Sequence, residues 1–176
     1  RNTSRFTAGL FKNRIHLNGD FTFWRLNDVE KRIYTPVPYS KKPGTMLERG
    51  ESKLNEDDDK TNYLAANLYA DYEQTIRKHY FKAMVGYNYE NSKLTSRYIQ
   101  RDGIINNELP DFSLTNGLNF TLRGGGNEWR TIGGFFRLNY VFDERYLLEV
   151  NGRYDGTSKF PQNQQWGFFP SASAGW

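Results

Sequence analysis

Apolar side chains recur at every second position over several stretches of this chain. In residues 63–73, the apolar set is Leu64, Ala66, Leu68, Ala70 and Tyr72. The same period of two runs through residues 15–23, 79–90, 131–142 and 145–155, and more weakly through residues 6–10 and 166–176. Such alternation is typical of a β-strand that turns one face to apolar surroundings and the other to water. The pattern therefore predicts about seven strands.

The connections between these stretches alternate in length. Lys12–Asn13, Thr75–Lys78 and Asp143–Arg145 are expected to be tight turns, whereas residues 27–60 and 91–128 are long polar segments and residues 156–165 are intermediate. Loops longer than about 12–15 residues are uncommon in compact soluble domains. Short periplasmic turns and long extracellular loops are the rule in outer-membrane barrels. We therefore predict an all-β fold, an antiparallel transmembrane β-barrel segment of about seven strands.

The aromatic residues of the apolar positions agree with this fold class. They gather at both ends of the expected strands, while Ala, Leu and Val occupy the middle. Aromatic girdles that flank an aliphatic band suit a bilayer, because Tyr and Trp favour the headgroup level. Only a closed barrel satisfies every backbone group of a strand in lipid. Since seven strands do not make the usual even-numbered barrel, we expect this chain to be one piece of a longer polypeptide.

Composition supports an ordered protein without a thick apolar interior. Of the 176 residues, 37% are hydrophobic and 16% are aromatic, and the mean hydropathy is −0.82. Disordered chains are poor in aromatics, so these rings indicate folded structure. The chain has no cysteine, which excludes disulfides, thiolate metal sites and a cysteine nucleophile. Its net charge of +4 is scattered without a basic run, so no nucleic-acid partner is expected.

The C-terminal third resembles the SusC/RagA family, the TonB-linked outer-membrane proteins of the Bacteroidetes. The resemblance covers about the last 50 residues and rests on Tyr146-Leu-Leu148, Asp155-Gly156, Ser158, Phe160 and the run from Trp166 to Trp176. The preceding stretch, residues 127–140, is also similar to the family's strand at that place. Pro161 stands where the family usually has Gly, and Tyr154 where Arg is common, so the details of this loop differ.

This resemblance implies a bacterial outer-membrane importer of oligosaccharides or peptides. It further implies a plugged lumen, energy from TonB–ExbB–ExbD through an N-terminal part, and a SusD-like surface lipoprotein as partner. We expect residues 1–176 to be part of the β-barrel domain of such a TonB-dependent receptor, with no plug domain and no TonB box among them. The resemblance implies carriage and not chemistry, so we predict no enzyme activity and no catalytic residues.

Two other interpretations of the sequence remain open. A porin, or a receptor for siderophores or vitamins, would share the barrel but lack the lipoprotein lid. A soluble β-rich carbohydrate-binding module or glycosidase would instead bury the apolar faces in a core, and a glycosidase would need paired carboxylates at a cleft. The absence of a co-purifying SusD-like lipoprotein would favour the porin or receptor. Extraction of the chain into plain buffer as a monomer would favour the soluble module.

Six residues are candidates for substrate contact or gating. They are Trp129, Tyr98, Arg137, Arg153, Asp155 and Lys159. Rings in long loops, such as Tyr34, Tyr39, Tyr98, Phe112 and Trp129, suit stacking on sugars or gripping peptides, and equally suit packing of the loops themselves. The charged positions suit selection in a watery lumen, and equally suit ion pairs with one another. The residues of Asp155–Phe160 also fit plain turn chemistry.

No cofactor is expected, and one weak metal candidate exists. The acidic run Glu56–Asp59 offers hard oxygen ligands for Ca²⁺ in an extracellular loop. It lacks the spacing of a calcium-binding loop, so a solvated charge run is the alternative. His16 and His79 have no ligand-type residue at metal spacing, and the sequence assigns neither of them a metal.

Overall fold

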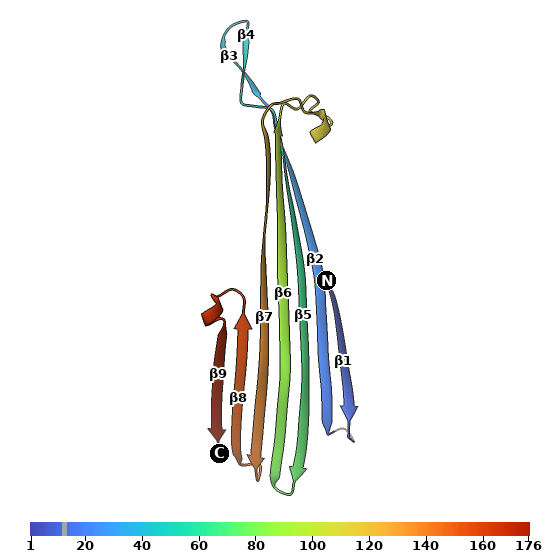
Figure 1. Ribbon diagram of the computed structural model, residues 1–176, viewed down its shortest axis with the longest axis vertical. Helices are drawn as coiled ribbons and strands as arrows, with labels where there is room; N and C mark the ends of the chain where they lie inside the picture. Colours follow the sequence, from blue (N-terminus) through green and yellow to red (C-terminus); the bar gives the residue numbers. More distant parts are fainter. Residues whose placement is uncertain (12–13) are drawn as a thin grey trace. The chain divides into compact units, whose positions relative to one another are not determined.

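Most strands of this chain lie side by side in one antiparallel sheet (Figure 1). The computed structural model describes residues 1–11 and 14–176. The strands are β1 (Asn2–Leu10), β2 (Ile15–Tyr34), β3 (Val37–Lys42), β4 (Thr45–Arg49), β5 (Lys53–Ile76), β6 (His79–Asp102), β7 (Phe120–Phe142), β8 (Tyr146–Thr157) and β9 (Trp166–Gly175). Two short 3₁₀ helices, η1 (Phe112–Leu114) and η2 (Gln162–Gln164), lie in the connections. None of the helices in the described part of the chain is long and apolar enough to cross a membrane.

Seven of the described strands form one sheet in the order β1-β2-β5-β6-β7-β8-β9, and β3 pairs with β4 in a separate hairpin. This order follows the chain, as expected of a meander in which each strand pairs with the next. The predicted fold class and the seven strands are thus confirmed. Strands β1 and β9 are the two edges of the sheet among the described residues.

The chain divides into two compact units. Unit 1 comprises Arg1–Arg25, Asn62–Lys93 and Glu128–Trp176, and unit 2 comprises Leu26–Thr61 and Leu94–Asn127. Strands β2, β5, β6 and β7 contribute residues to both.

Two short turns of unit 1 lie within the segments that the sequence predicts: one is Arg77–Lys78, narrower than the expected Thr75–Lys78 because β5 continues to Ile76, and the other is Asp143–Arg145. The turn between β7 and β8 is Asp143–Arg145, with φ of 52° at Asp143 and 54° at Glu144. The Arg145 N–H donates to the Phe142 carbonyl at 3.1 Å. Two left-handed residues inside such a bond are typical of a type I′ turn, whose twist matches that of antiparallel strands. The turn expected at Lys12–Asn13 lies outside the described residues.

The long segments differ from the prediction, because much of them is strand. Strand β2 continues to Tyr34 and β5 already begins at Lys53, so the expected loop 27–60 is largely ordered in strands. Likewise, β6 continues to Asp102 and β7 begins at Phe120, within the expected loop 91–128. The loop boundaries were therefore wrong. Polar residues dominate these parts of the strands, and the few apolar ones, such as Leu26, Val29 and Ile33, do not keep the period of two by which a strand is recognised.

Unit 1 has one polar and one apolar face. We call the face that carries Asn67, Asn88, Arg137 and Arg153 the polar face, because their side chains are joined by hydrogen bonds across strands. The opposite face, the apolar face, carries Val85, Leu138 and Leu148, which are 62%, 50% and 47% exposed. The only buried hydrophobic side chains of the described residues are Leu54 and Ala65. No described residue of this chain therefore covers the apolar face.

Aromatic rings line the apolar face near the short turns. Phe81 and Tyr140 lie with ring centroids 4.9 Å apart, and Phe142 and His79 are also 4.9 Å apart. His79 Nδ1 lies 2.8 Å from the Tyr140 hydroxyl. This band of rings, in which Phe142 also stacks on Tyr146, agrees with the aromatic residues expected at the ends of the strands.

Rings on the apolar face also cover glycines on neighbouring strands. Phe136 is directly paired with Gly152, and a Cβ atom added to Gly152 would clash with its ring. The other pairs of this kind are Phe6 with Gly19 and Trp166 with Gly156. A ring laid over a glycine shields the exposed backbone of that strand and fixes the register of the pair.

Candidate functional site

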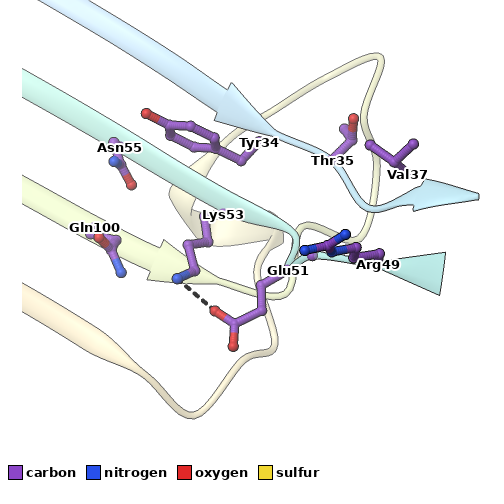
Figure 2. A pocket seen from close by; sticks show the side chains of 9 residues that line it. Tyr34, Thr35, Val37, Arg49, Glu51, Lys53, Asn55 and Gln100 are labelled. Carbon is purple, nitrogen blue, oxygen red and sulfur yellow. Dashed lines mark ion pairs between the residues drawn. The ribbon is translucent and has the colours of Figure 1, made fainter.

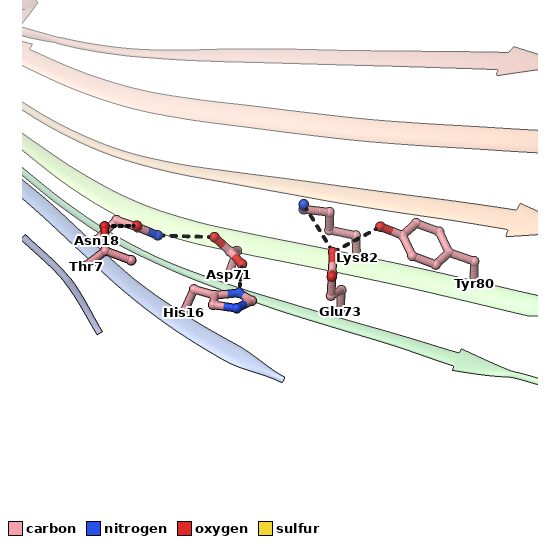
Figure 3. Close-up of polar contacts among 7 residues, drawn as sticks. All are labelled: Thr7, His16, Asn18, Asp71, Glu73, Tyr80 and Lys82. Atoms are coloured by element: carbon pink, nitrogen blue, oxygen red, sulfur yellow. Dashed lines mark hydrogen bonds and ion pairs between the residues drawn. The ribbon is translucent and has the colours of Figure 1, made fainter. Parts of the chain in front are cut away.

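A chain of polar side chains crosses the strands of unit 1 on the polar face (Figure 3). Thr7 of β1 donates to Asn18 of β2 at 3.0 Å, and Asn18 Nδ2 donates to Asp71 of β5 at 3.2 Å. His16 Nδ1 lies 2.9 Å from the other carboxylate oxygen of Asp71. The period of two places these residues on one face, because alternate side chains of a strand point the same way.

A second row of polar contacts runs through the asparagines. Asn67 of β5 donates to Asp20 of β2 at 2.9 Å, and Asn88 of β6 donates to Asn67 at 2.7 Å. Arg153 of β8 reaches Asn88 at 3.5 Å. Asn67 and Asn88 thus act as donor and acceptor at once, which connects four strands by a continuous series of hydrogen bonds.

Arg153 and Asp155 are brought together on β8. The Arg153 Nε lies 2.6 Å and 2.8 Å from the two carboxylate oxygens of Asp155. Gly133 of the neighbouring strand β7 lies beneath this pair, and a Cβ atom there would clash with the Asp155 carboxylate. The absence of a side chain at Gly133 leaves the space in which Arg153 crosses β7 towards β6.

Two further clusters of charged and polar side chains lie on the polar face. Glu73 of β5 accepts from Lys82 Nζ and from the Tyr80 hydroxyl, each at 3.3 Å (Figure 3). Arg137 of β7 donates to Asn151 of β8 at 2.8 Å, and Asn151 in turn donates to Glu149 at 2.7 Å. The predicted candidate Arg137 is therefore held in a hydrogen-bonded row with Asn151 and Glu149.

Trp129 and Lys159, far apart in the sequence, are neighbours. The Lys159 ammonium lies 4.0 Å from the centroid of the Trp129 ring. Ser158 holds this arrangement: its N–H donates to the Arg130 carbonyl at 2.9 Å, and its hydroxyl accepts from the Arg130 N–H at 2.8 Å. An ammonium over an indole face is a favourable cation–π contact. The two candidates form one aromatic and cationic patch.

Tyr98, the remaining candidate, belongs to unit 2. Its hydroxyl donates to Gln100 at 2.8 Å, and the Arg123 guanidinium lies 5.9 Å from its ring centroid. Of the six candidates, the structure brings together Arg153 with Asp155 and Trp129 with Lys159. Arg137 and Tyr98 each have other partners.

Unit 2 contains a cavity of about 810 Å³ that the sequence did not indicate (Figure 2). Its wall is formed by Tyr34, Thr35, Val37, Arg49, Gly50, Glu51, Lys53, Asn55 and Gln100. Lys53 Nζ lies 2.5 Å from Glu51 Oε2, and this hydrogen bond and charge raise the pKa of Lys53 above its ordinary value. Asn55 is only 8% exposed, and its Oδ1 has no hydrogen-bond partner among the described residues.

These lining residues escaped sequence analysis for a physical reason. They come from five strands, which only the fold brings together: the ends of β2, β4 and β6 and the starts of β3 and β5. Tyr34 alone was named, as an exposed ring of a long loop. No local spacing of residues marks such a site.

The acidic run Glu56–Asp59 lies inside strand β5, not in a loop. Asp58 lies 2.8 Å from Lys60, and Asp57 lies 3.8 Å from Arg32. Successive side chains of a strand point to opposite faces, so a run of four cannot converge on one ion as a loop would. Among the described residues, no group of three or more His, Asp or Glu side chains is placed to hold a metal. Binding of Ca²⁺ by this run stays a prediction.

Comparison with known proteins finds TonB-dependent receptors that are similar to this chain. It is 28% identical over 118 residues to the TonB-dependent receptor P3 of Formosa agariphila, a match that covers 66% of this chain and 12% of that protein. It is 48% identical over 42 residues to the TonB-dependent receptor SusC of Bacteroides thetaiotaomicron, covering 24% of this chain and 4% of SusC. This chain is similar to TonB-dependent receptors, SusC among them. No family model matches it.

The fold of this chain also matches solved structures. The RagAB peptide transporter superposes with a TM-score of 0.85 at 19% identity, over 98% of this chain and 19% of the matched chain. The RagAB peptide importer in its closed-closed state gives the same TM-score and coverage. The chain therefore spans at most about a fifth of the proteins that it matches. These relatives are receptors and transporters.

Proposed function

We propose that this chain is a wall segment of a SusC/RagA-type, TonB-dependent outer-membrane importer of oligosaccharides or peptides. One observation carries the proposal: the sheet of unit 1 has a hydrogen-bonded polar face and an uncovered apolar face. In a bilayer, the apolar face would contact lipid and the polar face would line an aqueous lumen. The relatives named above support transport as the function of the whole protein.

The proposed mechanism is carriage without covalent chemistry. A solute enters from outside, passes along the polar face and is released when energy from TonB–ExbB–ExbD shifts a plug. A SusD-like surface lipoprotein would close over the substrate. In this scheme Arg137 and the Arg153–Asp155 pair present charge to the lumen, while Trp129 with Lys159, and Tyr98, contact substrate. No catalytic residue, cofactor or nucleic-acid partner is required.

The polar network gives the wall a defined shape. Asn67, Asn88 and Arg153 use one another as partners, so their positions are fixed before a substrate arrives. Preorganised polar groups lose little conformational entropy when a solute binds. Because the groups of this network already pair with one another, few of them are left to bind a solute strongly. A solute can therefore leave the wall again.

The experiment is uptake in cells that carry or lack the gene for this protein. Labelled oligosaccharides and peptides are supplied with and without a protonophore, which removes the energy that TonB transmits, and the membrane protein is purified with whatever lipoprotein accompanies it. We expect gene-dependent uptake of at least one substrate, its loss on de-energisation, and a co-purifying SusD-like lipoprotein. Uptake that persists without energy and without a lipoprotein would favour a porin and contradict the proposal.

A further inference from the structure

The cavity of unit 2 has the properties of a prepared ligand site. Its volume of about 810 Å³ lies within the range of roughly 300–1,000 Å³ that small-molecule sites occupy. Most of its lining side chains are polar or charged, and they converge from several strands (Figure 2). Convergent polar groups in a concavity are a feature of binding sites and not of loops that merely pack together.

Asn55 supplies an independent indication of a ligand. Its side chain is more than nine-tenths buried, and its Oδ1 accepts no hydrogen bond among the described residues. A buried acceptor without a donor is unfavourable, because it has lost water and gained nothing in return. A hydroxyl or N–H group of a ligand in the cavity would satisfy it.

The charges of the cavity favour an anionic ligand. Lys53 and Glu51 neutralise each other across 2.5 Å. Arg49 forms no ion pair with the residues that the structure describes, so its guanidinium is the net charge of the wall. A guanidinium binds a carboxylate through two parallel hydrogen bonds, which makes a carboxylate the natural partner of Arg49.

The remaining lining residues favour a sugar over a peptide. Tyr34 is 47% exposed and offers a ring face to the C–H side of a sugar, while Gln100 and Thr35 add groups that suit hydroxyls. Val37 is the only aliphatic side chain of the wall, so an apolar peptide side chain finds no pocket.

We propose that this cavity binds a short, carboxylate-bearing oligosaccharide, with Arg49 on the carboxylate, Asn55 on a sugar hydroxyl and Tyr34 against a ring. The inference rests on the proposed import function and specifies its substrate class. The site lies wholly within unit 2. It therefore serves capture of the substrate, separately from the polar face of unit 1.

The test is calorimetric titration of the detergent-purified whole protein with trigalacturonate, with neutral maltotriose and with the acidic tripeptide Ala-Ala-Glu. We expect trigalacturonate to bind about tenfold or more tightly than maltotriose, as a charge-assisted hydrogen bond provides. Arg49→Gln should remove that difference, and Asn55→Ala should weaken both sugars. Arg97→Gln is the matched control, because Arg97 is an exposed arginine of unit 2 outside the cavity wall, and it should change nothing.

Three results would overturn the inference. They are equal affinity for the charged and the neutral sugar, unchanged binding in Arg49→Gln, and binding of the tripeptide alone. Since Arg49 is exposed, its variant tests the site even where Asn55→Ala does not fold. TonB-dependent uptake without trigalacturonate binding would reject this site and keep the import function, whereas Arg49-dependent binding without energised uptake would reject import and keep the site.

Discussion

Gly133 of β7 lies directly beneath the guanidinium of Arg153 of β8. A Cβ atom at Gly133 would lie 3.1 Å from Arg153 Nη2 and would clash with the Asp155 carboxylate. The missing side chain lets Arg153 cross β7 and contact Asn88 of β6 at 3.5 Å. One glycine therefore connects the charged pair of β8 with the asparagine row of the polar face.

Replacement of Gly133 by valine should destabilise the folded barrel by about 1–3 kcal/mol, the usual effect of overpacking. The valine side chain would displace Asp155 and Arg153 and break the contact to Asn88. The measurement is urea unfolding of the whole protein in lipid vesicles, followed by tryptophan fluorescence.

The matched control is Gly134→Val at the next position, where a Cβ atom meets nothing within 4 Å. A β-branched residue there should be tolerated, since valine favours strands. If both variants lose the same stability, the Gly133–Arg153 relationship carries no special weight.

Introduction of arginine at Leu138 should be costly in a bilayer. Leu138 is 50% exposed on the apolar face, and a cation on the lipid side of a barrel costs about 2–4 kcal/mol at mid-membrane depth. The same change at the adjacent Asn139, on the polar face, should cost far less. Unfolding free energies of L138R and N139R in vesicles measure the difference, and equal values would contradict the assignment of the two faces.

Removal of the Lys159 charge should loosen the patch that it forms with Trp129. The ammonium lies 4.0 Å from the ring centroid, and an exposed contact of this kind contributes about 0.5–1 kcal/mol. Lys159→Met should lose that amount in unfolding free energy, whereas Lys159→Arg should retain most of it because a guanidinium also binds aromatic faces. Equal losses in both variants would show that the positive charge of residue 159 does not stabilise the patch.

The short helix η1 should respond to acid. Asp111 accepts from the Ser113 N–H at 2.8 Å and from the Ser113 hydroxyl at 2.5 Å, and these bonds lower the pKa of Asp111 below its ordinary value of 3.8. A lowered pKa stabilises the folded form above pH 3.8, and the stabilisation is lost as the pH falls through the folded-state pKa. The Ser113 amide resonance should therefore shift with a midpoint below 3.8, and Asp111→Asn should abolish this titration. A midpoint at or above 3.8 would exclude the cap.

Sequence alone predicts the fold well in unit 1 and poorly in unit 2. In unit 1, Leu138 and Arg137 have opposite surroundings, so apolar and polar residues alternate and reveal both the strand and its faces. In unit 2, the strand residues Glu56–Asp59 are acidic at every position, which hides the strand. The same cause made the expected loops too long.

The candidate residues show a similar limit. The pairing of Trp129 with Lys159 depends on the register of β7 against β8, which places Thr131 opposite Thr157 and is not visible in either segment alone. Arg49, Asn55 and Gln100 have no motif at all, because their proximity arises only from the arrangement of β4, β5 and β6. Sequence identifies which residues share a strand face, and the sheet decides which of them meet.

The central claim is that the apolar face meets lipid and the polar face meets water. These 176 residues contain no cysteine. Single cysteines are introduced at Val85, Leu138 and Leu148, and at Arg137 and Glu149, in the whole protein after any cysteine elsewhere in it has been replaced by serine, and each is then spin-labelled. Accessibility to oxygen, which concentrates in lipid, and to a water-soluble nickel complex is then measured in vesicles. We predict oxygen-dominated relaxation at the first three positions and nickel-dominated relaxation at the other two; the reverse pattern would contradict the account.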